Sequence, residues 1–221
     1  MIDDARNDGD GPRYFGVFPA VVTNVVDGKK LGRVEVRFPF LGEAGASVRA
    51  WATLLTPYAD DDQGLTILPA KGSQVVVGFE AGVLERPYIL GAAWNGKEKL
   101  PAAPAEANNL RVLKTRSGSL LEFDDTGGAA KVTLTLKSGL KLVLDDANSE
   151  VLLKHSNGCE LSFDADGEVT ISAMAGVTIN APGGFTVNAP STSCSGSVTC
   201  QAHTATSVTS PLYSQGAGNM W

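Results

Sequence analysis

Few residues of this 221-residue chain are able to do acid–base or metal chemistry, because it contains only two histidines, His155 and His203. A serine hydrolase needs a histidine beside its nucleophile, and no nucleophile elbow of the G-x-S-x-G type accompanies either one. The phosphate-binding pattern GxxxxGK[ST] and the metal patterns HExxH and CxxC are also absent from the sequence. We therefore expect a protein with no catalytic site and no cofactor.

Neighbouring carboxylates are the next candidates for chemistry. Asp124-Asp125 and Asp145-Asp146 recur at the ends of predicted strands, and Asp60-Asp61-Asp62 forms an acidic run. Paired glycosidase acids face each other across a cleft, which a build of short strands does not offer. A calcium site needs six or more oxygen ligands. We interpret all three groups as solvated turn residues.

The thiols and the N-terminus bear on the cellular compartment. Cys159, Cys194 and Cys200 are an odd number, and the polar N-terminus has no apolar segment of the kind that secretory signals contain. We expect no signal peptide, and three small buried thiols in place of a disulfide framework. The sequence has no run of 18 apolar residues, so we expect no membrane span.

The net charge excludes one class of partner, and the distribution of aromatic residues divides the chain into two regions. The formal net charge is −6, which argues against nucleic-acid binding because phosphate contacts need an excess of Lys and Arg. Ten of the aromatic residues lie between Tyr14 and Trp94, so the composition changes near residue 95.

The first region contains short stretches rich in β-branched and aromatic residues, separated by Gly, Pro and Asp clusters. In GRVEVRF (32–38), Val34, Val36 and Phe38 alternate with charged residues, the pattern of a strand with one buried face. Short strands with long turns predict a small antiparallel barrel. The predicted strands lie within 15–27, 32–38, 48–55, 74–79 and 87–94.

The second region is repetitive and follows a linker rich in Pro, Ala and charge, KEKLPAAPAEANN (97–109). SGSLLEFDD (117–125) recurs as SGLKLVLDD (138–146) and as NGCELSFDAD (157–166). Each copy is a turn, an alternating strand and an acidic turn, with the alternating stretches KVTLTLK and EVLLKH between the copies. This meander of short strands predicts a fibrous or solenoid build.

Residues 167–190 repeat one eight-residue phrase three times, as GEVTISAM, AGVTINAP and GGFTVNAP. Alternation by two puts the large apolar side chains of each octad on one face of a strand, and two closing prolines exclude a helix. An octad spans at most roughly 26 Å at about 3.3 Å per residue, too little to encircle a core. We therefore predict a triangular β-helix in which three chains each supply one side. The predicted trimer core is Val169, Ile171, Val177, Ile179, Phe185 and Val187.

The residues become smaller in STSCSGSVTCQAHTATSVTS (191–210). This shrinkage predicts that the β-helix narrows, although the same composition is also found in disordered segments. The β-branched Thr and Val residues, which follow the ordered octads, favour structure.

The first region resembles the OB-fold barrel of phage baseplate assembly protein V and of VgrG-type spikes. The resemblance is carried by GRVEVRF, by Trp51 and by GLTILPAKGSQVVVGFEAGVLERPYILGAAWNG (64–96). One departure is that Arg49 precedes Trp51, whereas the family has a basic residue after the tryptophan strand begins. KTRSGSLLEFDDTGG (114–128) is similar to the segment that opens the β-helix of VgrG-type proteins.

The resemblance implies an all-β homotrimer, with an N-terminal OB-fold barrel followed by a C-terminal intertwined triple-stranded β-helix. It implies a non-enzymatic central spike of a contractile injection machine, which links a baseplate hub to the tip and pierces the target envelope. Since no hub domain precedes the barrel, we expect the hub to be a separate protein. The alternatives are a trimeric receptor-binding fibre or adhesin, and a spike with cell-wall-degrading activity.

Two sites near the predicted tip follow from this interpretation. Three copies of His203 on a three-fold axis would lie at one level, which makes it the one candidate metal ligand. Spikes of this family that hold iron carry paired histidines, so we expect no metal and a packed or exposed His203. We predict that Met220 and Trp221 dock a PAAR-like tip protein or cargo; the alternative is a cap over the last β layer.

We therefore expect assembly in the cytoplasm without a signal peptide, incorporation into the baseplate of a phage tail or another contractile injection particle, and release outside the cell on firing. The expected partners are two further copies of the chain, the hub, the tip protein or cargo and the target envelope, and no nucleic acid. The expected divisions are an N-terminal arm (1–13), the barrel (14–95), a linker (96–110), the needle (111–210) and the tip segment (211–221).

Overall fold

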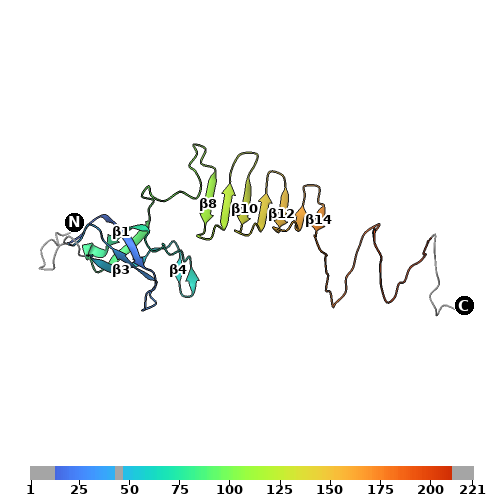
Figure 1. Ribbon diagram of the computed structural model, residues 1–221, viewed down its shortest axis with the longest axis horizontal. Helices are drawn as coiled ribbons and strands as arrows, with labels where there is room; N and C mark the ends of the chain where they lie inside the picture. The colour runs from blue at the N-terminus through green and yellow to red at the C-terminus, as the bar shows by residue number, and fades with distance from the viewer. Residues whose placement is uncertain (1–12, 43–46, 211–221) are drawn as a thin grey trace. The chain divides into compact units, whose positions relative to one another are not determined.

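The structure is a computed structural model that describes residues 13–42 and 47–210. The contacts divide the chain into a first unit that ends at Met174 and a second that begins at Ala175. The first unit contains every strand of the described chain, in a closed barrel, a seven-stranded sheet and a two-stranded hairpin (Figure 1).

The barrel forms from the five stretches that the sequence pattern predicts, and its strands close in the order β1-β2-β3-β7-β6. Neighbouring strands are antiparallel except for β3 and β7, which pair in parallel. The pattern does not predict the short hairpin of β4 (Ala59–Asp60) and β5 (Gln63–Gly64). The barrel strands are β1 (Val17–Asn24), β2 (Arg33–Arg37), β3 (Arg49–Leu54), β6 (Gln74–Phe79) and β7 (Pro87–Ala92).

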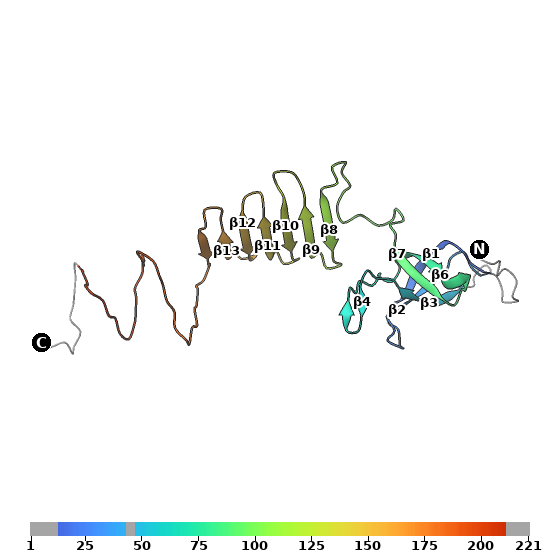
Figure 2. The same ribbon diagram turned by 180° about the vertical axis from the view of Figure 1, so that it is seen from behind.

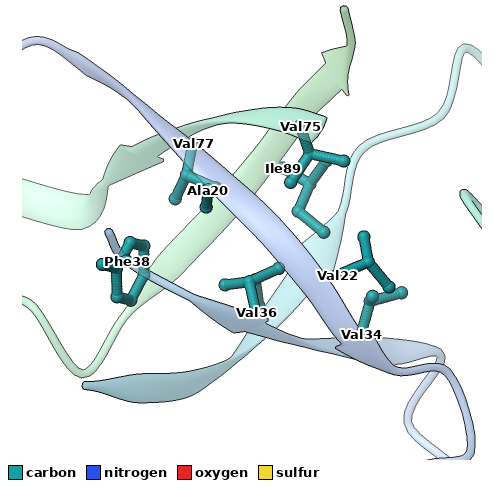
Figure 3. Packing of buried hydrophobic residues seen from close by; sticks show 9 residues of the cluster. Ala20, Val22, Val34, Val36, Phe38, Val75, Val77 and Ile89 are labelled. Atoms are coloured by element: carbon teal, nitrogen blue, oxygen red, sulfur yellow. The ribbon is translucent and has the colours of Figure 1, made fainter. Parts of the chain in front are cut away.

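The barrel core is built by strand alternation. Val34 and Val36 of β2 are fully buried, as the alternation in GRVEVRF predicts. In β6, Val76 is only half-buried, because in this alternating strand its side chain points away from the core that contains Val75 and Val77. Figure 3 shows how the buried side chains from different strands converge inside the barrel. The core consists of Ala20, Val22, Val34, Val36, Phe38, Ala52, Val75, Val77 and Ile89.

Aromatic rings close one end of the barrel. Phe18 lies in contact with Tyr14, Phe40 and Phe79, with ring centroids 6.2, 4.9 and 5.5 Å apart. The β6–β7 connection passes this end, and Gly82 within it has a φ of 76°. A Cβ at this glycine would lie 3.2 Å from the Phe15 ring. The position therefore favours glycine both for its positive φ and for the lack of space for a side chain.

The second sheet is a seven-stranded antiparallel meander in which every strand pairs with its sequence neighbours (Figure 2). The repeat that the sequence shows corresponds to one hairpin of this meander, and Gly118, Gly139 and Gly158 have φ values of 97°, 89° and 96° at its turns. Strand β8 is the member that the repeat does not predict. The strands are β8 (Leu110–Lys114), β9 (Leu120–Asp124), β10 (Lys131–Thr135), β11 (Lys141–Asp145), β12 (Glu150–Lys154), β13 (Glu160–Phe163) and β14 (Val169–Ser172).

The connections of the meander alternate between its two long edges. Figure 1 shows these edges above and below the strands. One edge carries the connections 115–119, 136–140 and 155–159, and the other carries 125–130, 146–149 and 164–168.

The second unit has no helix or strand within residues 175–210, and all of these residues are exposed. One backbone hydrogen bond, from the Gly184 N–H to the Ala181 carbonyl at 3.0 Å, closes a turn in it. The first octad contains β14, whereas the second and third octads form no strand in the single chain. Among the described residues, no helix is long and apolar enough to cross a membrane.

We predict that Ile89→Ala destabilises the barrel strongly. Ile89 is fully buried, and truncation of a buried isoleucine to alanine costs about 2–5 kcal/mol in free energy of unfolding. The neighbouring Leu90 points outward and is 49% exposed, so Leu90→Ala serves as the control and changes stability by about 0.5 kcal/mol or less. Urea unfolding followed by tryptophan fluorescence measures both; equal effects of the two variants would contradict the assigned inward and outward faces.

Candidate functional site

One face of the second sheet is almost entirely apolar. Residues that pair directly across neighbouring antiparallel strands point to the same side of the sheet. The pairing registers align two rows of side chains on this face. The first row is Leu113, Leu121, Leu134, Leu142, Leu153, Leu161 and Ile171, and the second is Arg111, Phe123, Val132, Leu144, Val151, Phe163 and Val169. We call these two rows the apolar face.

The opposite face has a different composition. Its central row contains Glu122, Thr133, Ser162 and Thr170 among apolar residues, and its outer rows carry most of the charges of the strands. Because β-strands alternate with a period of two, this sheet has one apolar and one mixed, polar side. Such a sheet ordinarily packs its apolar side against another layer.

No described part of the chain covers the apolar face. Leu153 is 50% exposed and Ile171 is 63% exposed, although both belong to regular, hydrogen-bonded strands. Contiguous apolar patches larger than a few hundred Å² are rare on monomeric proteins and usually indicate an interface. The apolar face is therefore the strongest candidate functional surface in the described chain.

The structure places the predicted core residues in two groups. Val169 and Ile171 lie on the apolar face, in the last strand of the sheet. The predicted core residues of the second and third octads are each more than half exposed. These are Val177, Ile179, Phe185 and Val187.

The candidate metal and acid–base residues do not form a constellation. Among the described residues no group of three or more His, Cys, Asp and Glu could hold a metal ion. His155 contacts Asn157 through Nδ1 and Oδ1 at 2.7 Å, and His203 lies exposed in the second unit. The expectation of three buried thiols is wrong. Cys159 is only half-buried, and Cys194 and Cys200 are exposed because their segment packs against nothing in the single chain.

The paired carboxylates lie where strands end and turns begin. Asp124 and Asp145 are the half-buried last residues of β9 and β11, so the expectation of solvated turn residues holds only for Asp125 and Asp146, which follow them and are exposed. Thr126 donates to Asp124 through its hydroxyl at 2.6 Å and its backbone N–H at 3.0 Å, and these bonds lower the pKa of the Asp124 carboxyl. Asn148 lowers the pKa of Asp145 in the same way, first through its backbone N–H. The carboxylates thus stabilise the turns and stay ionised. The proposed tip residues Met220 and Trp221 lie outside the described residues.

The barrel matches a known family. Residues 18–94 match the family described as the type VI secretion system/phage-baseplate injector OB domain. We call the barrel the injector OB domain after this match. Over 128 residues, 55% of its length, the chain is 23% identical to the type VI secretion system spike protein VgrG3 of Vibrio cholerae. Over 112 residues, 48% of its length, it is 28% identical to the type VI secretion system spike protein VgrG5 of Pseudomonas aeruginosa.

The family resemblance read from the sequence is thereby confirmed: the barrel matches the injector OB domain, and the chain is similar to VgrG spike proteins. The matched segments cover 13% and 14% of the two spike proteins, so the chain spans a small part of their length.

The injector OB domain carries a preformed loop between β1 and β2. The Asp27 carboxylate accepts backbone N–H bonds from Lys29 at 2.9 Å and from Leu31 at 3.1 Å. It also accepts two bonds from the Arg33 guanidinium, at 2.9 and 3.0 Å, and this guanidinium lies 5.7 Å from the Trp51 ring centre. OB-folds commonly bind ligands with such a loop and its neighbouring strands, but here the cation and the aromatic ring contact each other.

The Arg33 guanidinium, with help from the two N–H groups, holds the pKa of the Asp27 carboxyl well below its ordinary value of 3.8. A carboxyl whose pKa is lower in the folded state stabilises the fold above its unfolded-state pKa, and this contribution is lost as the pH falls through the folded-state pKa. Ionised Asp27 therefore stabilises the domain at neutral pH.

We predict that Asp27→Asn lowers the urea midpoint of the domain at pH 7. The difference from the unsubstituted protein stays constant above about pH 5 and shrinks progressively below about pH 4. Asp61→Asn, in the exposed turn of the β4–β5 hairpin, is the control and leaves the midpoint nearly unchanged. A difference for Asp27→Asn that persists undiminished down to pH 2 would show that the ion pair is not its cause.

Proposed function

We propose that the chain is the structural central spike of a contractile injection machine, and that it acts as a homotrimer. The observation that carries this proposal is the uncovered apolar face of the second sheet. It is supported by the injector OB domain and by the similarity to two proteins named as type VI secretion system spikes. In this proposal the protein has no catalytic role, and its action is mechanical.

The apolar face needs a cover that the described chain does not supply. Two further copies would each contribute an identical face, so that three sheets enclose a common core with their mixed faces in solvent. Burial of apolar surface stabilises by about 25 cal/mol per Å², which makes a face of this extent a strong drive for assembly. The octads support three copies in particular, because one octad is too short to surround a core but three supply about 24 residues per layer.

A closed prism suits a piercing needle for two reasons. Its core is shared by three chains, so bending one chain requires all three to lose contacts. Among the described strands of its sheets, only β8 and β14 have an edge free to pair with foreign strands, and each is at most five residues long. We propose that the injector OB domain attaches this needle to a baseplate hub and that sheath contraction drives it through the target envelope. The exposed Phe15 beside the aromatic end of the barrel supports a docking role for that end.

The test compares two adjacent leucines of β12 that lie on opposite faces. Leu153 belongs to the apolar face, and Leu152 pairs with Val143 and Ser162 on the mixed face. In the single chain Leu153 is exposed and Leu152 is half-buried, so Leu152→Asp would be the more disruptive change in a monomer. In the trimer the order reverses, because only Leu153→Asp places three carboxylates in the core.

We expect light scattering to give a trimer for the unsubstituted protein and for Leu152→Asp, and monomer or aggregate for Leu153→Asp. Circular dichroism of the same samples reports whether each chain remains folded. A monomeric unsubstituted protein at micromolar concentration would rule out the proposed assembly.

We also propose that Met220 and Trp221 bind a tip protein or cargo. Deletion of residues 211–221 should then abolish capture of a purified PAAR-like tip protein while the trimer persists. Undiminished capture by the truncated trimer would exclude this role for the segment.

A further inference from the structure

The two long edges of the second sheet carry opposite charge. The basic edge contains five Lys and Arg residues and a single carboxylate, whereas the acidic edge contains eight Asp and Glu residues and a single Lys. Figure 1 shows the acidic edge above the strands and the basic edge below them. The basic edge comprises 114–120, 135–141 and 154–160, and the acidic edge comprises 124–131, 145–150 and 163–169.

Most of these charges have no partner of opposite sign among residues 13–42 and 47–210 of their own chain. On the basic edge, Lys154 pairs with Glu160 at 3.5 Å. On the acidic edge, Asp125 lies 4.0 Å from Arg111 at the start of β8, and Lys131 lies across the strands from Asp124 and Asp145. Within the described part of the chain, no ion pair is formed by Lys114, Arg116, Lys137, Lys141, Asp146, Glu150, Asp164, Asp166 or Glu168.

The width of the sheet keeps the two edges apart. Each strand is about five residues long, so the edges are separated by roughly 16 Å at about 3.3 Å per residue. This exceeds the Debye length of about 8 Å at physiological ionic strength, and the edges of one sheet therefore attract each other only weakly. Complementary edges meet only when a second sheet is placed alongside.

We propose that the basic edge of one protomer docks on the acidic edge of the next, and that this pairing selects the edges that meet and the axial register of the trimer. The inference rests on the proposed trimer and names how its copies recognise each other. A three-fold rotation about an axis along the strand stack brings each edge beside the opposite edge of a neighbour, which is the heterologous contact of a closed ring.

The order of the connections supports a specific register. Along the stack, the basic turn that contains Lys137 joins β10 to β11, and the acidic turns that contain Asp125 and Asp146 join β9 to β10 and β11 to β12. Neighbouring strands are about 4.8 Å apart, so turns on one edge recur about every 9.6 Å. Three copies without axial offset therefore place Lys137 of one chain at a height between Asp125 and Asp146 of the next. Basic turns then fit between acidic turns.

The same pattern acts against incorrect assemblies. A copy inserted upside down would bring like-charged edges together, which is unfavourable, whereas the apolar faces alone would tolerate it. Exposed ion pairs contribute little stability individually. We therefore infer that the edge charges determine which edges meet and in which register. Burial of the apolar face supplies the affinity between the copies.

The test uses charge exchange. The basic-edge variant carries Arg116→Glu and Lys137→Glu, the acidic-edge variant carries Asp125→Lys and Asp146→Lys, and the exchanged chain carries all four changes. We expect each two-residue variant to form trimers at a concentration at least about tenfold higher than the unsubstituted chain does, and the exchanged chain to recover. Because Asp125→Lys leaves two cations facing each other at Arg111 in the exchanged chain too, this recovery has to come from contacts between chains.

Co-expression of the unsubstituted and exchanged chains with distinguishable tags gives the decisive readout. Native mass spectrometry should show two kinds of homotrimer, with mixed trimers at least about tenfold below their random proportion. Mixed trimers at the random proportion, or an exchanged chain that assembles no better than the two-residue variants, would overturn edge recognition while leaving the trimer intact. Failure of the unsubstituted chain to trimerise would instead contradict the proposed function itself.

Discussion

The need to cover one apolar sheet face is the constraint on which the rest of this structure depends. In the second sheet, seven strands align leucine, valine and phenylalanine in two rows on one side, and the backbone of every strand is hydrogen-bonded. Hydrogen bonding between strands is thus satisfied within the chain except along the outer edges of β8 and β14, while hydrophobic burial is not. A sheet in this condition is well defined in its register but incomplete as a folding unit, because globular domains need a second layer around a common core.

The injector OB domain shows how the same alternation is satisfied by one chain. Its strands close into a barrel, so that each strand faces others across the interior and the residues of a single chain surround Ile89 and its neighbours. The second sheet has the same alternation but stays open, because its first and last strands, β8 and β14, do not pair with each other. The chain therefore combines a region whose core is internal with one whose core has to be shared.

The sequence predicts this division well where alternation and turn chemistry agree. The barrel strands and the meander were both identifiable because glycines recur where the hairpins need a positive φ, as at Gly139, and because apolar residues alternate between them. The β4–β5 hairpin escaped prediction because its two-residue strands, Ala59–Asp60 and Gln63–Gly64, have no apolar alternation. Strand β8 was not predicted, because its short sequence has no repeat of its own and it forms a strand by pairing with β9. Of the residues on the apolar face, the sequence predicted only Val169 and Ile171 as core residues. The other members of the two rows lie on this face because of the register between strands, which the sequence does not specify.

Strand pairing within one chain ends where the meander gives way to the octads. In the meander about ten residues supply one strand and one turn, so the chain reverses and pairs with itself. Pro182 and Pro190 close the second and third octads, and proline cannot donate a hydrogen bond to a neighbouring strand. Neither octad forms a strand in the single chain. The last strand that pairs within the chain, β14, is also the strand of the first octad, and beyond Met174 no strand forms within the described residues.

In the proposed trimer the missing pairing comes from the other two copies. The apolar positions Val177, Ile179, Phe185 and Val187 then continue the rows that β14 begins with Val169 and Ile171, so that intrachain pairing at the base gives way to interchain pairing toward the tip.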